Sequence, residues 1–457
     1  MALSRREALK FSGIAAAALA VSGCNGEEPK PAEASKTSAD TTNSSVGMGT
    51  KAPIPDGKGP RVVVVGGGWS GLAIAKYTKK FAPNADVILV EQRSEFISCP
   101  ISNLYLVEAV ELEFLTHDYL QAARENNYTF FNATVVGIDK NKRTITTSNG
   151  DINYDYLVLA PGIDYDYRPW NVDLALEQRL RTEYPAGFIP GSEHITLKNK
   201  LADFEEGNFI LTVPGGNYRC LPAPYERACL IADYFKKNDI PGKVILLDEN
   251  PDITIKKEGF QSAFDEMYKD YLEYHPNSKI MKIDLEKKMV VAGEFDDEFE
   301  FADAAFYPHV RGGKLLEVCG VAKDTAFNKM EGNIDPFTYE VIGEKNIFVT
   351  GDARPMGYSK SGNTANSEGH YMGKLLAERI NGNKEITWKS PLTVCYSAVS
   401  AAPNHAISVR AEYKYEGKKL AGFTNVELSQ EWRGKVGTNN GKALMEWAKG
   451  MYRDMFS

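Results

Sequence analysis

A β-branched run that leads directly into a glycine motif constrains the fold of this chain more than any other feature. Residues 61–65 read R-V-V-V-V, which suits a strand buried on both faces, and G-G-G-W-S-G follows at 66–71. Residues 72–80 have the apolar pattern of a helix, 86–90 that of a second strand, and Glu91 closes that strand. This order of strand, glycine turn, helix, strand and acid predicts a Rossmann-type unit that binds a dinucleotide.

Each part of the motif has a role in holding a pyrophosphate. Glycines permit a tight turn and a close approach of backbone N–H groups at a helix N-terminus, where the helix dipole favours an anion. Glu91 follows the last glycine by about 20 residues, so its carboxylate is placed to accept hydrogen bonds from ribose hydroxyls. The residues expected to bind the dinucleotide are Gly66, Gly68, Trp69, Ser70, Gly71, Glu91, Gln92, Arg93 and Val136.

Two later segments indicate that the dinucleotide is FAD. Residues 154–162 resemble the strand and turn that return the chain to the cofactor in flavoproteins with two dinucleotide domains. Residues 346–352 resemble the strand that directs an aspartate at the ribityl chain of FAD. Together they add Ala160, Pro161, Gly162, Gly351 and Asp352 to the expected FAD-binding residues. Because the two segments are far apart, a second domain is expected between two halves of the FAD domain.

The second domain has the pattern of a nucleotide-binding unit without its glycine turn. Residues 208–213 predict a strand, 225–236 an amphipathic helix and 243–248 a strand that ends in an acid. Where a glycine motif would stand, residues 214–220 read P-G-G-N-Y-R-C, and the prolines that follow would block a close pyrophosphate cradle. The sequence therefore predicts that NAD(P)H binding has been lost and that electrons enter from another donor.

The six cysteines include no C-x-x-C pair and no C-x-x-C-H haem motif. They are Cys24, Cys99, Cys220, Cys229, Cys319 and Cys395. In an exported protein two distant cysteines can form a structural or a redox-active disulfide, and the spacing leaves both open. Cys229 and Cys319 are expected to be small buried apolar residues. The histidines show no metal-binding spacing, so no metal is expected.

Residues 220–228, C-L-P-A-P-Y-E-R-A, resemble the active-site loop of the flavin subunit of flavocytochrome c sulfide dehydrogenases. Residues 395–397, C-Y-S, are similar to the segment with the second redox cysteine of that family. The resemblance extends over the chain from Arg61 onward, with further matching stretches at 351–353, 360–362, 365–367, 447–448 and 454–456. Residues 98–103 are similar to the segment whose cysteine, here Cys99, bonds covalently to FAD, although Pro100 stands where the family has an aromatic residue.

The resemblance implies a sulfide-oxidising site. It implies that Cys220 and Cys395 form a disulfide beside the flavin, and that hydrosulfide opens it to a persulfide and a thiolate. Two electrons then pass to FAD, and sulfur leaves as zero-valent sulfur or polysulfide. Glu226 is the expected acid/base; the alternative is a helix-dipole partner. Lys360 is expected to place positive charge near the flavin, and an exposed loop lysine is the alternative.

The electron acceptor is expected to be a separate c-type cytochrome subunit, because flavin can release electrons singly and this chain has no haem motif. Three alternatives remain. A sulfide:quinone oxidoreductase would show a membrane-inserting apolar C-terminus, whereas the helix expected at 442–455 has charged residues interspersed. An NADH-dependent disulfide reductase would need the missing glycines. A non-catalytic sulfur-carrying or electron-transfer subunit could also retain flavin. Trp447 on that helix is expected either to cover the flavin or to pack in the core.

The N-terminal segment predicts export. Ser4-Arg5-Arg6 followed by a short apolar run reads as a twin-arginine signal at 1–24, which implies folding around a cofactor before export to the periplasm. Residues 21–24, V-S-G-C, resemble a lipobox, so Cys24 is either a lipid anchor, the expected link to a membrane, or an incidental thiol. Residues 25–60 have the composition of a disordered linker.

Composition sets further limits on the partners. With 43% hydrophobic and 25% charged residues, the chain is an ordinary globular protein. Its net charge of −8 argues against nucleic acid and leaves small molecules, here sulfide or polysulfide, and proteins as partners. The expected fold is α/β with two Rossmann-like domains. The FAD domain (61–174 and 315–384) is split by a degenerate NAD-type domain (175–314), and a small α+β C-terminal domain (385–457) follows.

Overall fold

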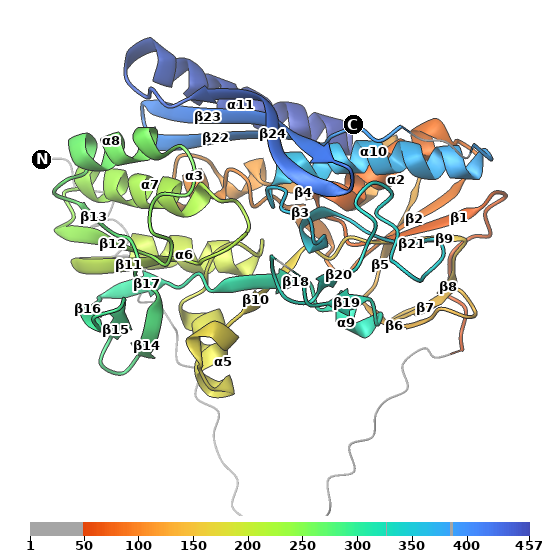
Figure 1. The fold of residues 1–457 in the computed structure, drawn as a ribbon, viewed down its shortest axis with the longest axis horizontal. Helices are drawn as coiled ribbons and strands as arrows, with labels where there is room; N and C mark the ends of the chain where they lie inside the picture. Colours follow the sequence, from red (N-terminus) through yellow and green to blue (C-terminus); the bar gives the residue numbers. More distant parts are fainter. Residues whose placement is uncertain (1–48, 326, 384–386) are drawn as a thin grey trace, which may run out of the picture. The chain divides into compact units, whose positions relative to one another are not determined.

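Five parallel strands form the sheet of the first nucleotide-type domain (Figure 1). The structure is a computed structural model that describes residues 49–325, 327–383 and 387–457. In sheet order the strands are β21 (Ile347–Val349), β9 (Tyr156–Leu159), β1 (Arg61–Val65), β2 (Asp86–Glu91) and β5 (Thr129–Asn132). Val62, Val63 and Val64 are fully buried, as expected for a parallel strand covered on both faces. The segments expected from 61–65, 86–90, 154–162 and 346–352 thus meet in one sheet.

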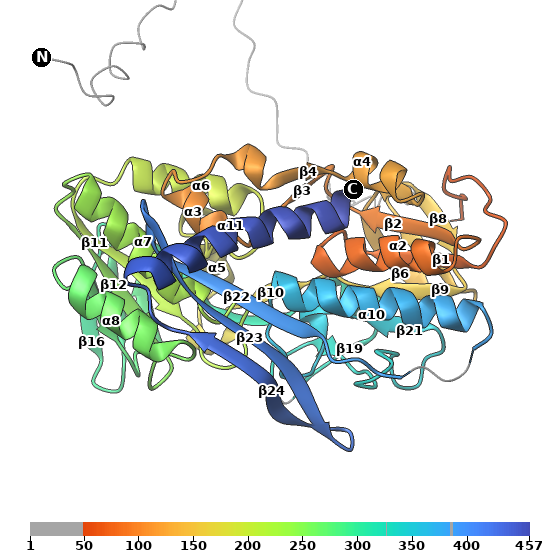
Figure 2. The ribbon, with the colours of Figure 1, turned by 90° about the horizontal axis from the view of Figure 1, so that it is seen from above.

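Two long helices cover one face of this sheet and lie side by side (Figure 2). They are α2 (Trp69–Phe81) and α10 (Gly362–Ile380). Their close approach requires glycine, since a Cβ at Gly369 would lie 2.5 Å from the Ala73 Cβ and one at Gly373 would lie 2.6 Å from the Tyr77 Cβ. The antiparallel sheet of β6 (Val135–Asp139), β7 (Thr144–Thr147) and β8 (Gly150–Asn153) lies on the other side of the parallel sheet (Figure 1).

The second domain is built around four parallel strands and has the architecture expected of a second nucleotide unit. In sheet order they are β13 (Leu272–His275), β12 (Gly242–Asp248), β11 (Gly207–Val213) and β17 (Asp303–Ala305). Its helices are α6 (Ser192–Ala202), α7 (Ala223–Lys237) and α8 (Lys257–Met267), and an antiparallel sheet of β14 (Ile280–Asp284), β15 (Met289–Ala292) and β16 (Asp297–Glu300) is attached.

One pair of short strands connects the two domains, and the remaining short elements lie around the sheets. The antiparallel pair β10 (Ile163–Asp166) and β18 (His309–Gly312) brings the chain into and out of the second domain. The other described elements are β3 (Glu95–Ile97), α3 (Ser102–Leu106), β4 (Thr116–Asp118), α4 (Tyr119–Glu125), α5 (Leu174–Glu183), α9 (Leu315–Val318), β19 (Ala322–Lys323) and β20 (Glu331–Gly332). Single 3-10 turns form at Leu112–Phe114, Arg168–Trp170 and Gly351–Ala353.

The C-terminal segment folds as a three-stranded antiparallel sheet covered by one helix (Figure 2). The strands are β22 (Leu392–Ala401), β23 (Asn404–Glu416) and β24 (Lys419–Ser429), and the helix is α11 (Gly434–Phe456). The helix begins eight residues before the expected start at 442, within a glycine-rich stretch that hid it. Gly441 is needed there, because a Cβ would lie 2.1 Å from the Asn404 backbone oxygen. The expected α+β class of this segment is therefore confirmed.

The last turn of α11 is fixed by the carboxylate of Asp454. It accepts hydrogen bonds from Tyr77 Oη at 2.6 Å, His370 Nε2 at 2.9 Å and Asn366 Nδ2 at 3.1 Å. Burial alone would raise the pKa of Asp454, but these hydrogen bonds and the His370 charge lower the pKa well below its usual range. Asp454 therefore ties α11 to α2 and α10 as a carboxylate.

We expect Asp454→Asn to lower the free energy of unfolding by about 2 kcal/mol at neutral pH, because hydrogen bonds to a charged acceptor are lost. Since the folded-state pKa is depressed, this stabilisation is complete above the unfolded-state pKa of about 4 and disappears as pH falls through the folded-state value. Urea unfolding at several pH values measures it. Glu446→Gln, on the exposed side of the same helix, is the control, and an unchanged Asp454→Asn midpoint would contradict the assignment.

The linker expected at 25–60 is wrong at its end. Ala52 and Ile54 are buried, and Ala52 N donates to the Asp151 backbone oxygen at 2.9 Å. Asp151 N in turn donates to the Thr50 backbone oxygen at 2.7 Å, so apolar burial and backbone pairing attach this end of an otherwise polar segment. The predictions for 1–48, including the export signal and Cys24, lie outside the described residues. Within the described ranges, no helix has the length and apolar character needed to cross a membrane.

Candidate active site

The glycine turn between β1 and α2 has the geometry of a dinucleotide cradle. Gly66 has φ of +106°, and a Cβ there would lie 2.3 Å from the Ala160 backbone oxygen. A Cβ at Gly71 would lie 1.9 Å from the Gly66 oxygen. Gly67 N donates to Glu91 Oε2 at 2.7 Å, which places the acid at the end of β2 against the turn. Neither Gly66 nor Gly71 tolerates a side chain.

Gly68 differs, because a Cβ there would meet no atom within 4 Å. We expect Gly71→Ala to lower the free energy of unfolding by roughly 3 kcal/mol because the methyl group overlaps backbone. We expect Gly68→Ala to leave the unfolding of flavin-free protein unchanged and to lower the flavin content, since this side of the turn faces the pyrophosphate. Flavin absorbance per polypeptide and urea unfolding measure both, and full flavin retention by Gly68→Ala would contradict the cradle.

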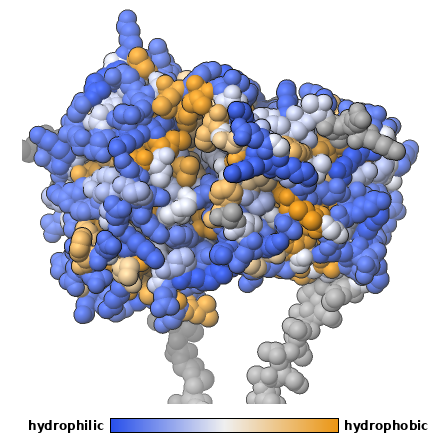
Figure 3. Space-filling view, viewed as in Figure 1, coloured by the Kyte–Doolittle hydropathy of each residue, from blue (hydrophilic) through white to orange (hydrophobic). Residues whose placement is uncertain are grey.

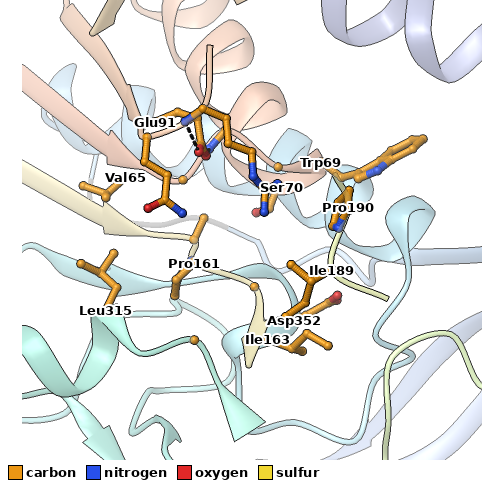
Figure 4. Close-up of a pocket in the computed structure, with 18 of the residues that line it drawn as sticks. Val65, Trp69, Ser70, Glu91, Pro161, Ile163, Ile189, Pro190, Leu315 and Asp352 are labelled. Atoms are coloured by element: carbon orange, nitrogen blue, oxygen red, sulfur yellow. Dashed lines mark hydrogen bonds between the residues drawn. The ribbon is translucent and has the colours of Figure 1, made fainter. Parts of the chain in front are cut away.

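A cavity of about 580 Å³ extends from this turn (Figure 4). Most of the predicted residues line it: Gly66, Gly68, Trp69, Ser70, Glu91, Gln92, Arg93, Ala160, Pro161, Gly162 and Asp352. Gly71 and Gly351 shape the turns behind it, and Gly351 has φ of +67°. Val136 is different. Its side chain is 54% exposed, whereas the preceding Val135 lines the cavity, and the pairing of β6 with β7 is irregular between Val135 and Gly137.

The cavity residues fit FAD. Asp352 Oδ1 is buried and has no hydrogen-bond partner within the described part of the chain, while Oδ2 lies 3.3 Å from Arg219 Nε. An unpaired buried carboxylate oxygen is an acceptor for a ligand hydroxyl, as the ribityl chain of FAD would supply. The backbone N–H groups of the glycine turn suit the pyrophosphate and Glu91 suits the ribose. FAD, when bound, would be held by these groups.

A second cavity, of about 60 Å³, adjoins the first and shares Arg219, Ser361 and Gly362 with it. The predicted chemical residues meet here: Cys99, Cys220, Glu226, Lys360 and Cys395 all line it, together with Trp447. These residues come from five separate segments of the chain. The structure therefore brings the sequence-predicted redox residues together beside the FAD cavity.

Cys220 and Cys395 are in contact, and both are free thiols in the structure. Cys220 follows β11 with φ of +56°, and its N–H donates to the Lys360 backbone oxygen at 2.7 Å. A left-handed conformation at a non-glycine residue stores backbone strain, which is often found at functional positions. Cys395 lies on β22, opposite Val409 of β23. A sheet strand and a strained loop thus hold the two thiols at hydrogen-bonding distance.

The environment makes the two thiols unequal. The hydrogen bond with Cys395 and burial raise the pKa of the Cys220 thiol. The hydrogen bond from Cys220, the Lys256 charge and a hydrogen bond from Ser397 lower the pKa of Cys395, against the opposing effect of burial. The surroundings therefore favour the negative charge of a reduced pair on Cys395 over Cys220.

Glu226 lies in the first turn of α7 and is buried against the same cysteine pair. Its Oε1 accepts a hydrogen bond from Ala398 N at 3.1 Å. Burial, followed by the negative charge of Cys395, raises the pKa of Glu226 to about 7. A carboxyl that titrates near neutral pH is suited to take up and return protons. A helix-dipole role needs no such burial.

Lys360 is buried, not an exposed loop residue. Its Nζ lies 2.7 Å from Glu331 Oε1 and 2.6 Å from the Asp352 backbone oxygen. Burial lowers the pKa of Lys360, and the Glu331 charge opposes this. The ammonium is therefore paired within the protein. The buried side chain fixes the backbone of Lys360, whose carbonyl oxygen accepts the hydrogen bond from Cys220 N.

Cys99 is buried at the smaller cavity, with its Sγ 3.7 Å from the Phe188 backbone oxygen. Burial raises its pKa, and the charges of Arg219 and Arg227 oppose that effect. Cys229 and Cys319 are buried core residues, as expected, and line neither cavity. Among the described cysteines, Cys99 is thus the one besides Cys220 and Cys395 that lines a cavity.

Trp447 was expected either to cover the flavin or to pack in the core, and its position combines features of both. Its ring stacks on Trp69 with centroids 6.0 Å apart and planes 7° from parallel, and its Nε1 donates to Asn363 Oδ1 at 3.1 Å. It also lines the smaller cavity. Trp447 therefore packs against a residue of the FAD turn and faces the cavity at the same time.

Sequence reasoning missed Arg219 and Lys256. Arg219 lines both cavities, donates to the Phe188 oxygen at 2.9 Å and pairs with Asp352. Its position directly before Cys220 was an available signal. Lys256 contacts Ser397 from a loop before α8, and no pattern in the sequence marks it.

In the second domain, the turn that replaces the glycine motif and the acid at the end of β12 form hydrogen bonds with neighbouring residues. Asp248, the acid at the end of β12, accepts from Tyr225 Oη at 2.6 Å and from Tyr274 Oη at 3.0 Å. The Tyr218 hydroxyl, in the replaced turn, donates to the Leu221 oxygen at 3.0 Å. Asp248 and the Tyr218 hydroxyl are therefore engaged in hydrogen bonds within the protein. Among the described residues, no cluster of histidine, cysteine and carboxylate side chains could hold a metal ion.

Comparison with known proteins gives three family matches along the chain. Residues 60–183 match the family described as pyridine nucleotide-disulphide oxidoreductase. Residues 195–306 match the central part of the sulfide dehydrogenase [flavocytochrome c] flavoprotein chain, and 390–456 match the flavocytochrome c sulphide dehydrogenase, flavin-binding family. Fold and site together define a flavin-dependent oxidoreductase of the pyridine nucleotide-disulphide class.

Individual proteins similar to this chain belong to the same class. The sulfide dehydrogenase [flavocytochrome c] flavoprotein chain of Chlorobaculum thiosulfatiphilum is 54% identical over 43 residues, which is 9% of this chain and 90% of that one. A mitochondrial sulfide:quinone oxidoreductase of Dictyostelium discoideum is 23% identical over 78% of both chains. The solved sulfide:quinone oxidoreductase of Aquifex aeolicus has the same fold, with a TM-score of 0.69, 17% identity and coverage of 87% of this chain and 91% of that chain. The chain belongs to the flavocytochrome c sulfide dehydrogenase flavoprotein family.

Proposed function

We propose that this protein is an FAD-dependent sulfide dehydrogenase in which Cys220 and Cys395 form the redox disulfide. The observation that carries the proposal is the contact between Cys220 and Cys395. Two cysteines from distant segments are in contact in a small cavity that adjoins the FAD cavity, next to a carboxyl whose pKa is raised to about 7. The match of residues 195–306 and 390–456 to the flavocytochrome c sulfide dehydrogenase families supports the same function.

The reaction begins when hydrosulfide attacks one sulfur of the disulfide. A new S–S bond forms to that cysteine, the Cys220–Cys395 bond breaks, and the other cysteine leaves as a thiolate. When zero-valent sulfur departs and the disulfide closes again, each hydrosulfide ion has lost one proton and two electrons. Glu226 takes the proton. Bound FAD would supply the redox chemistry, since flavin accepts electrons as a pair and can release them singly.

The small size and charge of the inner cavity favour an inorganic donor. About 60 Å³ admits hydrosulfide or a short polysulfide, whereas the body of an organic thiol would have to remain outside. Arg219, Arg227 and Lys360 line it, and of these Arg219 is paired with Asp352 and Lys360 with Glu331, while Arg227 has no ion pair among the described residues. The Arg227 guanidinium therefore favours an anionic donor in a protein whose net charge is −8.

We also propose that Cys99 binds FAD covalently. If so, flavin will stay with the polypeptide after acid denaturation of the wild type and will be released from Cys99→Ser. Gel filtration in denaturant, followed by flavin absorbance of the protein peak, measures this. Cys319→Ser, a buried cysteine outside both cavities, is the control and should keep its flavin attached. Release of flavin from the wild type would overturn the covalent bond while leaving the redox proposal intact.

A c-type cytochrome is the proposed electron acceptor, and a quinone is the alternative. The apolar face of α11 is packed inward: Leu444, Ala448, Tyr452, Met455 and Phe456 are all buried. That helix has no free apolar face with which to enter a membrane. Apolar side chains form separate patches on an otherwise hydrophilic face (Figure 3), and the edge strand β24 exposes Phe423, Val426 and Leu428. A patch of this kind suits a protein partner.

Steady-state assays decide the acceptor. With sulfide as donor, we expect reduction of a purified c-type cytochrome and little reduction of a water-soluble quinone. The reverse preference would favour the quinone enzyme. A protein that holds flavin but shows no bleaching by sulfide would be a non-catalytic electron-transfer or sulfur-carrying subunit.

Export by the twin-arginine route, with a lipid anchor at Cys24, stays part of the proposal. It is supported by the motif at residues 4–6 and the lipobox-like residues 21–24. Cell fractionation of the wild type and of Arg5→Lys/Arg6→Lys tests it: periplasmic or membrane-attached wild type with cytoplasmic retention of the variant is expected. Equal distribution of the two would refute export by this route.

A further inference from the structure

Lys256 is a buried lysine whose two side-chain hydrogen bonds both go to the segment of Cys395. It precedes α8 with φ of +55° and is 4% exposed. Its Nζ donates to Ser397 Oγ at 2.7 Å and to the Cys395 backbone oxygen at 3.3 Å. Among the described ion pairs, which extend to 4.0 Å, none includes Lys256. A buried ammonium without a carboxylate partner carries a desolvation penalty that an anion nearby would offset.

The other cations around the cysteine pair are already engaged. Arg219 pairs with Asp352, and Lys360 pairs with Glu331. Arg227 donates to Asn103 Oδ1 at 2.9 Å and to the Gly187 backbone oxygen at 3.0 Å. Arg227, like Lys256, has no carboxylate partner among the described ion pairs, but its hydrogen bonds go to other segments, whereas those of Lys256 go to the segment of Cys395.

The remaining groups that face Cys395 define the charge balance. Cys220 comes from the loop before α7 and Glu226 from α7, while Ser397 lies two residues along β22 and is hydrogen-bonded to the Cys395 thiol. Cys99 lines the same cavity. When the two cysteines are joined as a disulfide, neither is charged. Attack by hydrosulfide transfers its negative charge to one cysteine sulfur, and among the described residues it is the Cys395 side that has an ammonium without an ion pair and a hydroxyl donor beside it.

We propose that Lys256 is a positioning residue that, through Ser397 and its own charge, makes Cys395 the thiolate released when the disulfide opens. This inference rests on the proposed function, because it requires the pair to react as a disulfide. Hydrosulfide attacks the Cys220 sulfur and a bond forms between them. The Cys220–Cys395 bond breaks, and its electron pair stays on Cys395 Sγ. The single negative charge thus moves from hydrosulfide to Cys395, and Cys220 holds the persulfide with its hydrogen.

The test is the pH dependence of alkylation at Cys395 in the reduced, flavin-containing protein, without sulfide. Iodoacetamide reacts with thiolate, and peptide mass spectrometry resolves Cys395 from Cys220. In Lys256→Met we expect the midpoint of the Cys395 profile to rise by about one pH unit, which is a roughly tenfold slower reaction at neutral pH. Lys256→Arg should restore the wild-type profile, because it returns the charge.

Two further variants keep the test decisive. Lys257→Met removes the neighbouring exposed lysine, which pairs with Asp252, and should leave the profile unchanged. Ser397→Ala removes only the hydroxyl and should shift the midpoint in the same direction by a smaller amount, which serves if Lys256→Met does not fold. The proposal would be overturned if the Cys395 profiles of the wild type and Lys256→Met superimpose. If Lys256→Met does not fold, the comparison of the wild type with Ser397→Ala decides in the same way. A protein that shows the shift but no bleaching by sulfide would instead refute the proposed function.

Discussion

Cys395→Ser is expected to lower the rate of sulfide-driven flavin reduction by roughly 10³-fold or more, because removal of an essential sulfur nucleophile or leaving group has effects of this size. Serine cannot form the disulfide that hydrosulfide opens. Cys220→Ser should have the same effect, and the double variant should be no slower than either single variant, because the two sulfurs act as one unit. Stopped-flow mixing with sulfide, followed by the loss of flavin absorbance, measures all three.

Two controls give this result its meaning. Cys229→Ser replaces a thiol that is fully buried in the same helix as Glu226 but lines neither cavity, so its rate should stay within about twofold of the wild type. Dithionite should reduce the flavin of every variant, which shows that the cofactor is bound and competent. Normal bleaching of Cys395→Ser by sulfide would remove the disulfide from the mechanism.

Glu226→Gln is expected to slow sulfide-driven flavin reduction by about 10²-fold, because a positioned acid/base contributes this much. The glutamine can still accept the hydrogen bond from Ala398 N, so the fold around β22 should be kept. Burial raises the pKa of Glu226 to about 7. The proton-accepting carboxylate therefore increases as pH rises through 7, and the advantage of the wild type should grow over that range and then level off.

Hydrogen sulfide also ionises with pH, but it does so equally for both proteins. The ratio of the wild-type rate to the Glu226→Gln rate, measured across neutral pH, isolates the carboxyl. Glu258→Gln, in the exposed first turn of the next helix, is the control and should follow the wild type at every pH. A rate ratio that does not change with pH would remove Glu226 as the base and leave it a structural residue.

Much of the fold was predictable because local signals and the global fold agree. The valine run at 61–65, the glycine turn and Glu91 gave the first strand, cradle and acid in their observed places, since each has a geometric requirement that few residue types satisfy. The missing glycines at 214–220 predict that the second domain does not bind NAD(P)H, and this stays a prediction. Cys220, Cys395 and Glu226 could be grouped only by resemblance to a family, because their sequence spacing contains no contact information.

The remaining features depend on tertiary contacts. Lys256 directly precedes α8, which contacts β23 through Gly259 and Ile407, and nothing near Lys256 in the sequence marks its approach to Cys395. Val136 was expected at the cavity, but Val135 lines it instead, at a place where the pairing of β6 with β7 is irregular. The start of α11 was missed because glycines that weaken a helix in isolation are required where it packs on β23.

Anaerobic titration of the flavin-containing protein with sulfide tests the central claim most directly. The claim is that sulfide delivers electrons to the flavin through the Cys220–Cys395 disulfide. The visible absorbance of oxidised flavin should disappear in the wild type at about one sulfide per flavin, since each sulfide supplies one electron pair. It should persist in Cys395→Ser under excess sulfide. Flavin that stays oxidised in the wild type, or that bleaches equally in both proteins, would contradict the account.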